Sequence, residues 1–239
     1  TLSFSCMARE TINGQEAVNV ASVWADNGEL RQDDTRIYVN TAILKLDKTV
    51  LNLYAAGQEQ DKQDGRLDQE FRTGEEVIYQ VTVENLQPGS IARNLVVEDT
   101  SLPEYLTLCD PSEITIEGIP EEIQEPAEVT EDVSNETNPQ YYGETQTKEV
   151  ASLLSMEEGG WKLTVSDLPS GYPVTITYRC AVTEEANGKE IINVARSWSG
   201  NSEMVEDAEK IWINTPKLTI TKQSDKGTYL VGDTQTYTI

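Results

Sequence analysis

Apolar and polar residues alternate along short segments of this chain, which is the pattern of strands that bury one face. Turn-forming residues separate the segments, and no long stretch has the period of an amphipathic helix. We therefore predict an all-β fold built from antiparallel, Ig-like β-sandwich repeats in tandem. The alternating segments read ILKLDKTV, EEVIYQVTVE, ARNLVVED, WKLTVSDL, YPVTITYRCAV, EIINVARSW and EKIWINT.

The sequence also repeats itself. Thr1–Lys48 aligns without gaps on Thr175–Lys222, so that NGQEAVNVASVW returns as NGKEIINVARSW. After a gap, FRTGEEVIYQV (Phe71–Val81) resembles YLVGDTQTYTI (Tyr229–Ile239). Self-similarity at a fixed offset is the signature of a tandem array.

The repeat divides the chain into three parts. We expect residues 1–41 to be the C-terminal strands of one repeat, 42–215 to be a complete repeat, and 216–239 to be the N-terminal strands of the next. Two stretches interrupt the complete repeat. Leu51–Glu70 has no counterpart at the start of the next repeat, and the acidic stretch Pro120–Glu158 is predicted to be a loop or flexible excursion.

Composition excludes several classes of function. The formal net charge of −24 argues against nucleic acid or an anionic membrane surface as a partner. The chain has no histidine, which removes histidine bases, histidine metal ligands and Ser-His or Cys-His nucleophiles. No apolar run is long enough to span a membrane. We predict no enzymatic turnover and no cofactor.

One segment has the composition of a calcium-binding loop, DKQDGRLDQE at Asp61–Glu70. With Gly65 at the sixth loop position, the first and last ligand positions fall on Gln60 and Phe71, which do not supply the required carboxylates. We therefore predict a solvated loop here and no metal site in the chain.

Three polar residues fall on predicted buried faces. By strand alternation, Lys48 shares a face with Leu44 and Leu46, whereas Lys45 points to the other face. Asn193 likewise shares a face with Ile191 and Ala195, and Asp99 with Leu95 and Val97. A buried ammonium group must be paired or neutralised, so these three side chains are expected to face one interior.

The order of these motifs resembles a known family. LKLDKTV, TGEEVIYQVTVEN, ARNLVVEDTSLPEYLTL, LPSGYPVTITYRCAV and IINVA together resemble the DUF11-type repeat and the related isopeptide-forming domains of Gram-positive fimbrial and surface proteins. The resemblance covers the complete repeat and both partial ends, and it departs from the family in the two insertions and the cysteines. It implies an extracellular, cell-wall-attached stalk or adhesin whose partners are the neighbouring repeats.

Some members of that family carry a Lys–Asn amide crosslink, which here implies Lys48 as nucleophile, Asn193 as electrophile and Asp99 as proton shuttle. Desolvation favours a neutral, nucleophilic lysine and a protonated aspartic acid. Three alternatives stay open. Lys48 can extend its ammonium to solvent from the strand end. Asn193 can satisfy backbone groups at a bulge or sheet edge while Asp99 begins the DTSLP turn, and Lys45 is the donor if a bulge shifts the register.

The repeat indicates which cysteines correspond to one another. Cys6 and Cys180 are equivalent positions, so a complete repeat holds Cys109 and Cys180, and the partner of Cys6 belongs to the preceding repeat. A Cys109–Cys180 disulfide suits a secreted protein, and two buried reduced thiols are the alternative.

Two functions remain after these exclusions. The first is a structural or adhesive stalk module of a long surface protein. The second is a glycan- or protein-binding sandwich that uses Tyr141, Tyr142 and Trp161 near the acidic stretch as an aromatic platform.

Overall fold

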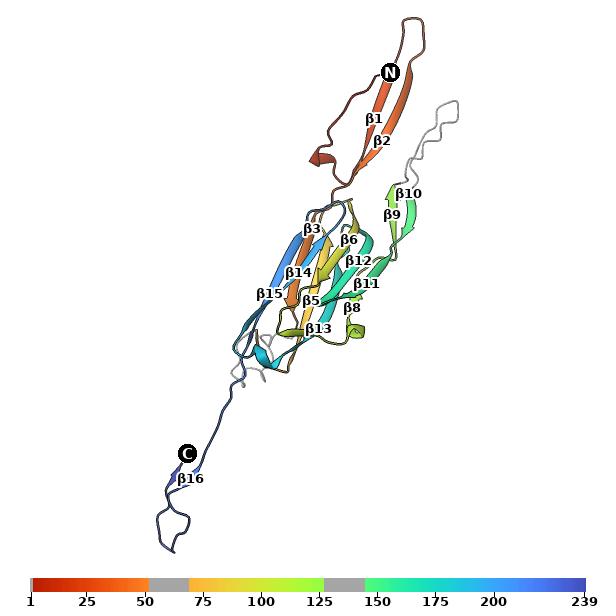
Figure 1. Cartoon of the computed structure of the whole chain (residues 1–239). Helices are drawn as coiled ribbons and strands as arrows, with labels where there is room; N and C mark the ends of the chain where they lie inside the picture. Colours follow the sequence, from red (N-terminus) through yellow and green to blue (C-terminus); the bar gives the residue numbers. More distant parts are fainter. Residues whose placement is uncertain (1, 52–68, 127–144) are drawn as a thin grey trace.

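The structure is a computed structural model that describes residues 2–51, 69–126 and 145–239. Two β-sheets pack face to face between residues 42 and 215, as predicted for this all-β chain (Figure 1). One sheet has the strand order β11-β12-β6-β14-β15-β4, and the other β3-β5-β13-β7 with β8 also paired to β13. The strands of the two sheets are β3 (Leu44–Val50), β4 (Glu70–Phe71), β5 (Glu76–Asn85), β6 (Ile91–Asp99), β7 (Leu106–Leu108), β8 (Thr115–Glu117), β11 (Ser152–Glu157), β12 (Gly160–Pro169), β13 (Val174–Val182), β14 (Glu190–Trp198) and β15 (Val205–Ile213).

The core lies between these sheets, and alternating residues of both fill it. Buried and less buried positions alternate along β3, β5 and β13, so each strand contributes every second side chain to the core. β4 pairs with β15 in parallel, and the other strand pairs of the described residues are antiparallel. Three 3₁₀ turns complete the described structure: η1 (Glu10–Ile12), η2 (Pro111–Glu113) and η3 (Glu184–Ala186).

The acidic stretch Pro120–Glu158 is not a loop throughout, so that prediction is wrong at both ends. β9 (Glu122–Pro126) pairs with β10 (Thr145–Glu149), and β11 is an edge strand of the six-stranded sheet. Lys148 Nζ lies 3.0 Å from the buried Asp167 carboxylate, which fixes this hairpin to the sandwich. The sequence pattern is weak here because an edge strand buries few side chains, whereas residues 127–144, including Tyr141 and Tyr142, lie outside the described part.

Two small hairpins flank the sandwich, one at each end of an elongated molecule (Figure 1). β1 (Gln15–Val23) pairs with β2 (Arg31–Val39) in the register of β14 with β15, since Asn19 faces Thr35 as Asn193 faces Glu209. β16 (Gln223–Ser224) pairs with β17 (Tyr237–Thr238) as Thr49 and Val50 of β3 pair with Gln80 and Tyr79 of β5. The two hairpins therefore have the same registers as these pairs of sandwich strands.

The first hairpin joins the sandwich through a defined junction. The Asn40 side chain binds both backbone groups of Ile91, with its Nδ2 2.9 Å from the carbonyl oxygen and its Oδ1 2.8 Å from the amide nitrogen. Asn201 Nδ2 donates to the Asn40 carbonyl at 2.9 Å. Gly89 needs to be glycine because its φ is +74° and a Cβ would lie 2.5 Å from the Gly14 carbonyl oxygen. These contacts define how the hairpin is seated on the sandwich.

Candidate functional site

Lys48 is buried inside the sandwich, on the face of β3 that also carries Leu44, Leu46 and Val50. Its relative exposure is 2%, whereas Lys45 is exposed on the opposite face. β3 alternates without interruption, so no bulge turns Lys45 inward. Lys45 is therefore not the donor side chain.

Asp99 and Asn193 meet Lys48 across the core. Lys48 Nζ lies 2.5 Å from Asp99 Oδ2, and Asn193 Nδ2 donates to the same oxygen at 2.9 Å. Asp99 ends β6 and Asn193 lies on β14, so the contact joins the two sheets. The structure thus brings the three predicted residues together, with Asp99 1% and Asn193 0% exposed. The Lys48 ammonium does not reach solvent.

Three aromatic residues that the sequence reading did not assign to the site enclose the cluster. The Tyr79 and Tyr178 rings stack with centroids 5.6 Å apart, and Trp161 meets Tyr178 edge to face at 5.2 Å. Lys48 Nζ lies 5.0 Å from the Tyr79 ring centroid. Trp161 is fully buried, so it cannot contribute to an exposed aromatic platform.

Tyr178 also contributes a hydroxyl group to the cluster. Lys48 Nζ donates to Tyr178 Oη at 2.9 Å and Asn193 Nδ2 at 3.2 Å, while the hydroxyl donates to Asp99 Oδ2. The alternation of Val174, Ile176, Tyr178 and Cys180 along β13 was the available signal, because it places Tyr178 on the buried face.

Burial controls the protonation of these groups. Desolvation lowers the pKa of Lys48, an effect that the negative charge of Asp99 opposes in part. Desolvation also raises the pKa of Tyr178 well above its ordinary value, so this hydroxyl keeps its proton. The neutral form of Lys48 is thus more favoured in this site than it would be in water, and the tyrosine beside it is neutral.

The orientation of the Asn193 amide determines which atom meets Asp99. Nδ2, the nitrogen that would leave as ammonia, faces Asp99 Oδ2. The Asn193 carbonyl oxygen and Asp99 Oδ1 are buried and have no hydrogen-bond partner among the described residues. In this arrangement Asp99 contacts the leaving nitrogen and does not contact the carbonyl oxygen.

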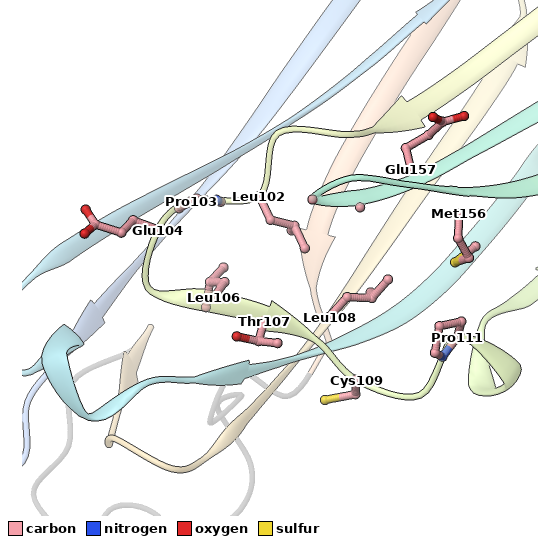
Figure 2. Close-up of a pocket in the computed structure, with 12 residues that line it drawn as sticks. Leu102, Pro103, Glu104, Leu106, Thr107, Leu108, Cys109, Pro111, Met156 and Glu157 are labelled. Carbon is pink, nitrogen blue, oxygen red and sulfur yellow. The ribbon is translucent and has the colours of Figure 1, made fainter.

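The predicted Cys109–Cys180 disulfide is absent, and all three cysteines are free thiols in the described structure. Cys180 pairs with Leu108 where β13 lies beside β7. The Cys109 amide donates a hydrogen bond to the carbonyl oxygen of Arg179, the residue before Cys180. Side chains of successive strand residues point to opposite faces, so Cys180 enters the core and Cys109 faces outward. Figure 2 shows Leu108 and Cys109 on opposite sides of the ribbon.

We expect all three thiols to react with a thiol reagent in denaturant without reductant. In the native protein Cys180 should be protected, because it is fully buried and burial raises its pKa, whereas the exposed Cys6 should react at once. Counting modified thiols by intact mass tests this. Two thiols that react only after reduction would mean that the disulfide forms.

A surface hollow of about 420 Å³ lies over β7 and the turn at Leu102 (Figure 2). Its lining is mainly apolar, with Glu104 and Glu157 as the charged members, and it offers no acid–base pair. Among the described residues, no three His, Cys, Asp or Glu side chains are grouped to hold a metal ion. In that same part of the chain, no helix has the length and apolarity needed to cross a membrane.

No family model and no curated protein matches this sequence. Solved structures with partial similarity include the pilus backbone RrgB of Streptococcus pneumoniae, with 16% identity, a TM-score of 0.40, and 67% of this chain and 32% of that chain covered. Others are the major pilin SpaD of Corynebacterium diphtheriae (14%, 0.38, 72% and 33%) and the major pilin subunit BcpA of Bacillus cereus (15%, 0.37, 82% and 48%).

The chain spans about a third of the RrgB and SpaD chains and about half of the BcpA chain. TM-scores this low do not establish a shared fold, so the function is inferred from the contacts within this chain.

Proposed function

We propose that this chain is part of a tandem-repeat stalk of an extracellular surface protein, and that Lys48 and Asn193 form an amide crosslink assisted by Asp99. The observation that carries the proposal is a buried cluster between the two sheets. In it, Lys48 Nζ and Asn193 Nδ2 both lie at hydrogen-bond distance from Asp99 Oδ2. Covalent joining of β3 to β14 would tie the first strand of the repeat to its penultimate one.

The stalk reading is supported by the equivalence of the flanking hairpins. β1–β2 reproduces the β14–β15 register, and β16–β17 reproduces part of the β3–β5 register. Lys222 Nζ lies 4.4 Å from the Tyr237 ring centroid, as Lys48 lies beside Tyr79. The opposite placement of the two hairpins suits an end-to-end array with neighbouring repeats as partners (Figure 1).

The crosslink reading is supported by burial and charge. An ion pair in the core pays a large desolvation penalty, and transfer of one proton from Lys48 to Asp99 converts it into a neutral pair. The neutral amine can then attack the Asn193 amide carbon, and ammonia leaves. Asp99 contacts both nitrogens and is positioned to take the proton that the Lys48 ammonium must lose before attack.

A structural ion pair without a crosslink would use the same contacts. The intact mass of the protein distinguishes the ion pair from the crosslink. The alternative of a glycan- or protein-binding sandwich has weaker support, because Trp161 is buried and Tyr141 and Tyr142 lie outside the described residues. The extracellular, cell-wall location follows from the sequence resemblance and is part of the proposal.

Intact mass spectrometry of the purified chain tests the crosslink. We expect the protein to be lighter than its sequence mass by one ammonia. The variant Asp99→Asn should have its full sequence mass, because it lacks the proton-carrying acid. Asp167→Asn is the matched control, since it removes another buried carboxylate of the same sheet and should still show the deficit. Wild-type protein at full mass would rule the crosslink out.

A further inference from the structure

The Tyr178 hydroxyl lies among the atoms that would react. It is 2.9 Å from Lys48 Nζ, the nucleophile, and 3.2 Å from Asn193 Nδ2, the leaving nitrogen, and it donates to Asp99. No other described hydroxyl contacts both nitrogens. This position, between the atom that must lose a proton and the atom that must gain one, is what a proton relay requires.

We propose that Tyr178 is a catalytic residue of the Lys48–Asn193 crosslink and carries a proton from the nucleophile to the leaving group. The inference rests on the proposed function and adds a role that Asp99 alone does not fill. Asp99 would hold the proton taken from the Lys48 ammonium before attack, which leaves the tyrosine to complete the exchange after attack.

The neutral Lys48 amine forms the Nζ–Cγ bond with Asn193, and the former amide nitrogen becomes tetrahedral and gains an available lone pair. The Tyr178 proton then turns from Asp99 to Nδ2, while one proton of Nζ passes to Tyr178 Oη. The Cγ–Nδ2 bond breaks and ammonia leaves. Tyr178 ends with a proton, unchanged, and the product is a secondary amide.

Burial also supports this role. It raises the Tyr178 pKa, so the hydroxyl is present in the protonated form that a relay needs.

Tyr79 provides a matched control within the same stack. It is equally buried and stacks on Tyr178 at 5.6 Å, yet its hydroxyl has no hydrogen-bond partner among the described residues. Tyr79→Phe removes a buried hydroxyl next to the site without touching a reacting atom, whereas Tyr178→Phe removes the proposed relay.

The experiment follows crosslinking by intact mass at intervals after a short pulse of induced expression. We expect Tyr178→Phe to fold, judged by circular dichroism and melting, and to lose ammonia at least about 100-fold more slowly than wild type. Tyr79→Phe should match wild type within about twofold. Fluorinated tyrosines placed at position 178 keep the ring and hydroxyl, and the rate should change with the acidity of the phenol, which a purely structural role would not produce.

The outcomes separate this inference from the proposed function. Wild type at full mass overturns both. A crosslinked wild type, together with a Tyr178→Phe variant that crosslinks at the same rate, overturns the relay alone. If Tyr178→Phe does not fold, the fluorotyrosine series decides: a rate that follows phenol acidity supports the relay, and a constant rate overturns it.

Discussion

Replacing Asn193 by alanine is expected to lower the melting temperature by at least about 10 °C. A crosslink between Lys48 and Asn193 closes a loop of roughly 145 residues, which on the chain-entropy model stabilises by about 5 kcal/mol. For a domain of this size each kcal/mol corresponds to about 2–4 °C in Tm. Without a crosslink, Asn193→Ala would remove only the two hydrogen bonds that Nδ2 donates, at about 1 kcal/mol each. Differential scanning calorimetry measures the shift.

Asn19→Ala is the control for this variant. Asn19 is the same residue type in the equivalent register position, but it lies exposed on the β1–β2 hairpin. Its replacement should leave the main transition unchanged. An Asn193→Ala shift of only a few degrees would be explained by hydrogen bonds alone and would contradict a covalent contribution.

Pulling on the two ends of the chain should extend the crosslinked sandwich by only a small fraction of its fully extended length. Residues between Lys48 and Asn193 are shielded from load by the amide bond, which leaves about 30 residues of the 42–215 unit free to extend. At about 3.5 Å per residue these residues give about 100 Å, against about 600 Å for the whole unit. Single-molecule force spectroscopy with handles at both termini measures the step.

Asp99→Asn provides the comparison for the pulling experiment, because without the acid the crosslink should not form. Its sandwich should unfold in one long step at lower force. A long step from the wild-type protein would mean that hydrogen bonds alone carry the load in this repeat.

The faces of the strands could be predicted from the sequence because strand alternation is a local property. Lys48, Asp99 and Asn193 each lie on a strand whose apolar partners define the buried face, and the structure buries all three. The repeat also matched residues 1–41 to the end of the complete repeat, and the β1–β2 hairpin has the register of β14–β15. These predictions needed no knowledge of how the sheets pack.

The remaining features depend on pairing between distant segments. The disulfide prediction failed because Cys109 follows β7 one position beyond the residue that faces Cys180, and this register is not visible in either segment alone. Trp161 was missed for the same reason, since it reaches the site only because β12 pairs with β6 opposite Asp99. β4 and β11 lack a pattern of their own because they are a very short strand and an edge strand.

Sequencing of tryptic peptides tests the crosslink most directly. Trypsin does not cut after an acylated lysine, so the account predicts a branched species in which Leu46–Lys62, uncut at Lys48, is joined to Glu190–Arg196 through Lys48 and Asn193, with the loss of one ammonia. Recovery of Leu46–Lys48, Thr49–Lys62 and unmodified Glu190–Arg196 as separate linear peptides, with no branched species, would contradict it.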